Sequence, residues 1–67
     1  MTVILKMDTG DEYALDRNLR GPSVLDSVNE ARGKGKLIEF PDNRTPSRPI
    51  YIDPDHVVSV RDDGYSY

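Results

Sequence analysis

Hydrophobic and polar residues alternate at the start of the chain. Val3, Leu5 and Met7 are each separated by one residue, which is the two-residue period of a strand that turns one face toward a core. The turn-forming residues 8–11 interrupt this pattern, and the alternation resumes over residues 12–16. The pattern predicts a β-hairpin.

A helical spacing follows the hairpin. Pro22 suits the first turn of a helix, and Ser23 with Asp26 fits a capping box. Gly33 and Gly35 are typical of a helix end. The apolar positions between these signals have helical spacing: Val24, Leu25, Val28 and Ala31. We expect one amphipathic helix of about three turns, which is too short to be stable without packing on a sheet.

Strand character returns in the second half of the chain. Residues 36–40 form one predicted strand, and residues 50–52 and 57–60 form two more, rich in β-branched side chains. The three prolines in residues 41–49 predict a stiff exposed loop. Residues 62–67 are expected to be a flexible tail.

The predicted elements make a single α+β domain over residues 1–61, in the order β-β-α-β-β-β. We expect a bent, mostly antiparallel five-stranded sheet, SH3-like or a partly open barrel, packed against the helix. The expected core consists of Val3, Leu5, Met7, Tyr13, Leu15, Leu25, Val28, Ile38, Phe40, Ile50, Ile52, Val58 and Val60.

The length of 67 residues limits how this fold is stabilised. A chain this short buries only about 60% of its unfolded surface. It contains no cysteine and one histidine, so we expect no disulfide, no metal site and no cofactor. Self-association is then the common route to extra stability, and a homo-oligomer is expected. No apolar run is long enough to span a bilayer, which favours a cytosolic protein without a membrane partner.

The net charge of -3 conceals an uneven distribution. Residues 1–16 and residues 49–67 each carry a net charge of -3, whereas residues 17–48 carry +3. Whether the basic middle segment forms one face depends on the fold. The negative net charge of the whole chain argues against a protein that simply coats nucleic acid.

Two short acidic motifs are candidates for chemistry. The stretch Asp53-Pro54-Asp55-His56 has the composition of a turn between strands, with a cation or partner contact, or acid-base chemistry, as alternatives. The triplet Asp8-Thr9-Gly10 matches the core of the aspartic-protease motif, but a hairpin turn explains it in this position. No pair of groups has the spacing of a nucleophile and its base, so we expect no enzymatic activity and no catalytic residue.

Cations near the predicted helix suggest a phosphate or nucleic-acid contact as an alternative function. Glycines follow the helix here, whereas those of a phosphate-binding loop precede one, so helix termination is the favoured explanation of Gly33-Lys34-Gly35-Lys36. The candidate contacts are Arg17, Arg20, Arg32, Lys34 and Lys36.

Tyr51 is the aromatic residue of most interest. Ile50 and Ile52 occupy the alternate face of its strand, so Tyr51 points outward if they point inward. It stands close in sequence to Arg44 and Arg48, and tyrosine and arginine are enriched at protein interfaces. These three residues are the predicted protein-binding residues.

The stretch from Tyr51 to Val60 resembles the strand, proline turn and strand that close several small uncharacterised β-proteins of bacteria and phages. The turn before residues 12–15 adds to this resemblance. It implies a small SH3-like barrel and a bacterial or phage origin, and it assigns no functional residue. The leading expectation is a non-enzymatic binding or assembly module, and a phage protein that sequesters a host factor or a small signalling molecule is a further alternative.

Overall fold

The computed structural model of the protein describes residues 2–62 and 65–66. The α+β class and the order β-β-α-β-β-β are confirmed, and a further short strand follows the last expected one. The elements are β1 (Val3–Met7), β2 (Glu12–Ala14), α1 (Gly21–Ala31), β3 (Ile38–Pro41), β4 (Pro49–Ile52), the 3₁₀-helix η1 (Pro54–His56), β5 (Val57–Asp62) and β6 (Tyr65–Ser66).

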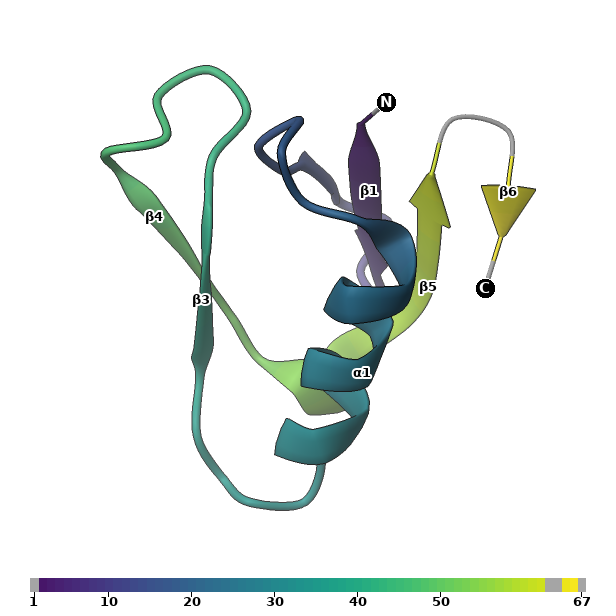
Figure 1. Ribbon diagram of the computed structural model, residues 1–67. Helices are drawn as coiled ribbons and strands as arrows, with labels where there is room; N and C mark the ends of the chain where they lie inside the picture. The colour runs from purple at the N-terminus through teal and green to yellow at the C-terminus, as the bar shows by residue number, and fades with distance from the viewer. Residues whose placement is uncertain (1, 63–64, 67) are drawn as a thin grey trace.

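Four of the strands form an antiparallel sheet in the order β2-β1-β5-β6, with α1 packed beside β5 (Figure 1). Val3, Leu5 and Met7 of β1 are buried because alternate residues of a strand share one face. Leu5 lies opposite Val60 of β5. Burying an aliphatic side chain of this kind stabilises a fold by about 1.5–3 kcal/mol, so this face is the centre of the core.

A bulge between β1 and β5 changes the face of one predicted core residue. Lys6 pairs with Ser59, but Met7 pairs with Val57, so β5 has one residue more than β1 between these two pairs. Such an insertion reverses the alternation of side chains. Val57 is therefore buried, and Val58 is 62% exposed. The prediction that Val58 belongs to the core is wrong for this reason.

The remaining two strands, β3 and β4, form a separate antiparallel hairpin that stands apart from the other strands at one side of the ribbon in Figure 1. A bridge between Leu15 and Asp42 connects this hairpin to the end of β2. The backbone bonds from Asp16 N–H to the Pro41 carbonyl, 2.9 Å, and from Asn43 N–H to the Ala14 carbonyl, 3.1 Å, strengthen this connection. The expected single sheet is thus divided in two, in an arrangement that fits a partly open barrel.

Helix α1 begins without the predicted capping box. Arg20 is the N-cap residue and makes no side-chain cap, and Ser23 is already the third residue of the helix. Pro22 stands at the first turn as predicted, since its missing N–H is not needed there. Val24 and Val28 are buried against the sheet. Among the helices within residues 2–62, none is long and apolar enough to cross a membrane.

The buried core differs from the expected one at a few positions. Val24 and Val57 belong to it although they were not expected, because Val24 shares the buried face of α1 with Val28 and because β5 is bulged. Four expected core residues are half-buried and pack against its margin: Tyr13, Leu25, Ile38 and Ile50.

The end of the chain also differs from the expectation. Asp62 was expected to begin a flexible tail, but it is the last residue of β5 and is buried. Residues 65–66 pair with the end of β5 as β6, so the paired region continues beyond residue 61. Residues 63, 64 and 67, on which the rest of the tail prediction falls, lie outside the described residues.

Candidate functional site

Two acidic turns that are far apart in the sequence lie side by side. The backbone N–H of Asp8, in the β1–β2 turn, donates to the carbonyl of His56 at the end of η1, at 2.9 Å. Gly10 has a φ of +94°, which the tight turn requires and which other residues rarely adopt. The sequence gives no local sign of this contact, because 48 residues separate its partners.

The side chain of His56 joins the two turns. Its Nδ1 lies 2.6 Å from Oδ2 of Asp8, and its Nε2 lies 3.5 Å from Oδ2 of Asp53. The hydrogen bond with Asp8, followed by the negative charges of Asp8 and Asp53, raises the pKa of His56 above its ordinary value of 6.5. The protonated imidazole is thereby favoured, with both ring nitrogens directed at carboxylates.

A hollow of about 380 Å³ opens beside this histidine. It is lined by Met7, Asp8, Thr9, Asp11, Tyr13, Asp53 and His56. The Thr9 hydroxyl in this wall donates to Asp11 at 3.0 Å, away from His56. Across residues 2–62, no group of three or more histidine, aspartate or glutamate side chains is placed to hold a metal ion. The hollow is therefore an acidic surface with one exposed histidine beside its carboxylates.

The stretch Asp53-Pro54-Asp55-His56 is a connector between β4 and β5, as its composition predicts. Pro54 begins the single turn of η1, and the Asp53 carboxylate accepts the N–H of Asp55 at 3.0 Å. Asp55 in turn accepts the N–H of Gly33 at 2.8 Å. The connector thus also fixes the end of α1.

The predicted basic residues are not brought together on one surface. Arg17 and Arg20 precede α1, whereas Lys34 and Lys36 follow it, and the 11 residues of the helix separate the two pairs by about 16 Å. Each pair lines a different hollow. Arg32 donates to the carbonyl of Val57 at 3.0 Å, so it holds the helix end against β5.

The predicted protein-binding residues lie on the β3–β4 hairpin and its loop. Tyr51 is 62% exposed and pairs across the hairpin with Glu39, so it points outward as predicted. Arg44 and Arg48 are exposed in the loop. Asp42 shapes this loop, since its carboxylate accepts the N–H groups of Arg44 and Thr45, both at 3.2 Å.

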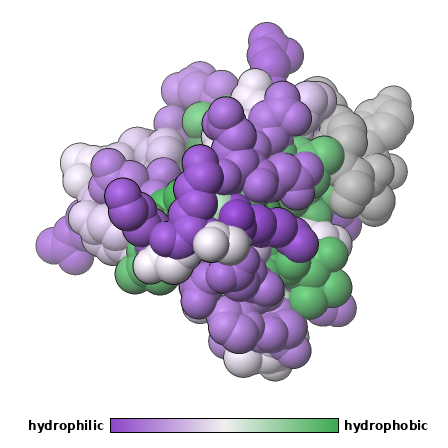
Figure 2. All heavy atoms as spheres, turned by 90° about the horizontal axis from the view of Figure 1, so that it is seen from below, coloured by the Kyte–Doolittle hydropathy of each residue, from purple (hydrophilic) through white to green (hydrophobic). Residues whose placement is uncertain are grey.

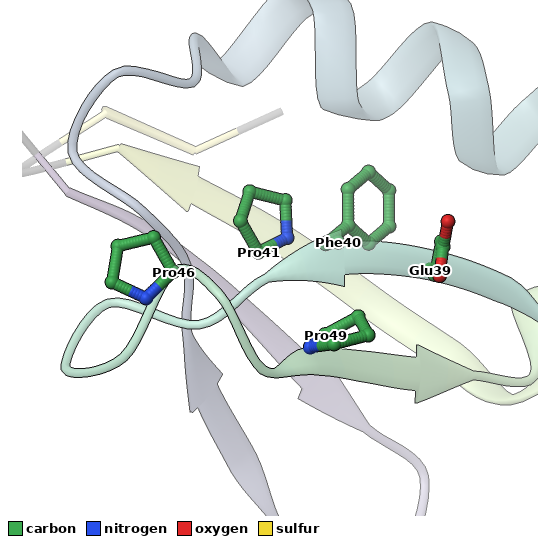
Figure 3. Close-up of a pocket in the computed structure, with 5 residues that line it drawn as sticks. All are labelled: Glu39, Phe40, Pro41, Pro46 and Pro49. Atoms are coloured by element: carbon green, nitrogen blue, oxygen red, sulfur yellow. The ribbon is translucent and has the colours of Figure 1, made fainter.

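A shallow hollow of about 260 Å³ lies at the base of this loop (Figure 3). Pro41 and Pro49 face each other as a cross-strand pair, and Pro46 reaches the same place from the loop. The hollow is lined by Glu39, Phe40, Pro41, Pro46 and Pro49. Rigid prolines lose little conformational entropy on binding, which suits a contact surface.

Apolar residues reach the rest of the surface only in places. The view from below shows a mostly polar face with separate hydrophobic patches (Figure 2). The large apolar side chains that are most exposed within residues 2–62 are Leu37, Tyr51 and Val58.

Asp62 is the residue of interest that sequence reasoning missed. It is only 6% exposed, and its Oδ2 accepts the N–H of Gly21 at 3.2 Å. One signal for its burial exists in the sequence, because it is two positions after Val60 and therefore on the same face of the strand.

The chain has no match among protein-family models, curated proteins or solved structures. The resemblance to small bacterial and phage β-proteins therefore stays a prediction.

Proposed function

We propose that the chain is a non-enzymatic binding or assembly module, which contacts a protein partner or further copies of itself. The contact surface comprises β4, Tyr51 and the loop over residues 41–49. The proposal rests on one observation above all, that the exposed Tyr51 lies on a strand which, within the described residues, pairs along one edge only. An unpaired strand edge offers backbone donors and acceptors to an added strand, and an exposed tyrosine beside it supplies apolar contact area.

The distribution of charge makes a second copy the first partner to test. In Figure 1 the loop that carries Arg44 and Arg48 lies before the start of β4, and the connector with η1, beside the acidic hollow, follows the other end of that strand. Contact between the loop of one copy and the acidic hollow of the next would join surfaces of opposite charge. Such an interface is heterologous, so it generates a ring or a filament.

The arrangement around His56 supports a non-enzymatic role. A histidine that serves as a general base needs a free ring nitrogen directed at a proton that it removes. Here Asp8 and Asp53 lie against the two nitrogens, and the nearby Thr9 hydroxyl donates to Asp11. The expectation of a cytosolic protein is part of the same proposal.

The test is a dilution series at low salt, followed by native mass spectrometry and sedimentation. Wild type is compared with a variant that carries Arg44→Glu and Arg48→Glu, and with one that carries Tyr51→Ala. We expect an oligomer that both variants weaken by at least tenfold in dissociation constant. A variant with Lys34→Glu and Lys36→Glu is the matched control, because it changes the charge equally at another place and should assemble normally.

Two results would contradict the proposal. The first is that the wild-type protein is a monomer at every concentration and that charge reversal at Arg44 and Arg48 leaves its binding to every purified protein partner unchanged. The second is an oligomer that the Lys34 and Lys36 reversal dissociates as strongly as the loop reversal does.

Nucleic-acid binding remains the second candidate, and the separation of the basic residues weakens it. A binder that uses all of these cations would lose affinity steeply as salt is raised. Filter binding of single- and double-stranded oligonucleotides between low and moderate salt tests this. A flat response to salt, or no binding at low salt, excludes the candidate.

A further inference from the structure

A second hollow, of about 270 Å³, lies at the start of α1. The segment between β2 and α1 provides most of its wall, and the end of β5 provides the rest. The lining residues are Arg17, Asn18, Leu19, Arg20 and Asp62. The hydrogen bond from Gly21 N–H to Asp62 holds the two segments together.

Asp62 is the unusual member of this wall. Its Oδ2 accepts the N–H of Gly21, the first residue of α1, and so caps the helix in place of a local side chain. Its Oδ1 is buried and has no hydrogen-bond partner among the residues that the structure describes. A buried carboxylate oxygen without a donor is costly to the fold, so it marks a place where a donor from outside would bind favourably.

Two of the other four lining residues, Arg17 and Arg20, are cationic. Arg17 and Arg20 are exposed, and neither guanidinium forms an ion pair with any residue in the described part of the chain. The N-terminus of α1 adds little to this charge, because the Gly21 N–H already donates to Asp62 and Pro22 has no N–H. The two guanidinium groups favour an anion, whereas Asp62 Oδ1 requires a hydrogen-bond donor.

We propose that this hollow binds a phosphate group that carries a proton. The P–OH group would donate to Oδ1 of Asp62, while the other phosphate oxygens would accept from Arg17 and Arg20. Phosphate suits both halves of the site because it is an anion that still bears a hydrogen at neutral pH. Sulfate has the same shape and no hydrogen at that pH, so it would place an acceptor against the Asp62 carboxylate.

This proposal is independent of the protein-binding surface. None of its residues lies on β4 or in the loop over residues 41–49. It also differs from a general basic surface, since Arg32, Lys34 and Lys36 take no part in it.

The test is calorimetric titration of the full chain with inorganic phosphate and with sulfate, at about pH 7.5 in a phosphate-free buffer of constant ionic strength. We expect saturable binding of phosphate, and sulfate binding at least about tenfold weaker, the factor that one hydrogen bond to a charged group provides. Equal binding of the two anions, or no binding of phosphate, would overturn the proposal.

Variants then separate the two halves of the site. Arg17→Ala with Arg20→Ala should weaken phosphate at least tenfold, whereas Arg44→Ala with Arg48→Ala is the matched control and should leave its affinity unchanged. Asp62→Asn keeps an acceptor for Gly21 and adds N–H donors, so the preference for phosphate over sulfate should disappear. Circular dichroism confirms that each variant is folded, and a preference that survives Asp62→Asn in a folded protein contradicts the assigned role.

The source of the phosphate is a separate arm of the experiment. A phosphate monoester has its second pKa at about 6, so most of its molecules have lost the second phosphate proton at about pH 7.5. A site for inorganic phosphate would bind inorganic phosphate well at this pH and glycerol phosphate poorly. A site for an ester would bind glycerol phosphate more tightly than inorganic phosphate at about pH 5.5. In both cases inorganic phosphate must bind at about pH 7.5, and the proposal fails if it does not.

Discussion

Two regions of this molecule differ in how their carboxylates are satisfied. Around His56, Asp8 and Asp53 are each about half exposed, and both face the same imidazole. At the start of α1, Asp62 is buried, and one of its two oxygens has no hydrogen-bond partner among the described residues. The cluster around His56 has more carboxylates, but water and the imidazole solvate them, so none of them is left without a partner.

Burial explains why the single aspartate is more informative than the cluster. An exposed carboxylate gains little from one more partner, since water already solvates it. A buried one has lost that solvation and gains the full strength of any hydrogen bond supplied to it. The hollow beside Asp62 is therefore the stronger candidate for a specific small ligand. The hollow beside His56 is better suited to contact with a positively charged protein surface.

The largest expected difference between the regions is in stability. Asp62→Ala removes the acceptor of the Gly21 N–H and should lower the free energy of unfolding by about 1–3 kcal/mol. Urea unfolding followed by circular dichroism measures this. Asp55→Ala is the control, because it also removes an acceptor from a backbone N–H at an end of α1, that of Gly33, in an exposed place. Equal losses in both variants would show that burial is not the deciding factor.

A smaller effect is expected in the pH dependence of the His56 cluster. The pKa of His56 is raised in the folded state, so its stabilisation is fully present below about pH 6.5, the ordinary value, and is lost as the pH rises through the higher folded pKa. Nuclear magnetic resonance titration of the imidazole measures that pKa. Asp8→Asn should move the pKa back toward 6.5, and an unchanged value would disprove the assigned cause.

The smallest effect is expected where an ion pair lies outside both regions. Arg61 donates to Glu12 at 2.7 Å, and this hydrogen bond, with the charge of Arg61, lowers the pKa of Glu12. The resulting stabilisation is present above about pH 4.5 and is lost as the pH falls through the lower folded value. Glu12→Gln should abolish this part of the pH dependence, as measured by thermal unfolding between low and neutral pH. Added salt should reduce it in wild type, and a salt-independent contribution would contradict a surface ion pair.

Local patterns predicted the elements well, because strands, helices and turns depend on neighbouring residues. The alternation of Val3, Leu5 and Met7 sufficed for β1, and Pro22 sufficed for the first turn of α1. The composition of residues 53–56 predicted their role as a connector. The outward direction of Tyr51 also followed from the alternation of its neighbours.

The sequence by itself determined the α+β class, the order of the elements and the face of most strand residues, because each of these follows from the period of apolar positions. Only the tertiary structure decided which residues meet across long separations. The bulge that exposes Val58, the pairing of Asp8 with His56 and the hydrogen bond from Gly21 to Asp62 all depend on how β1 and β5 are aligned and where α1 packs. These contacts carry no local signature, since their energy arises from groups that become neighbours only after the chain has folded.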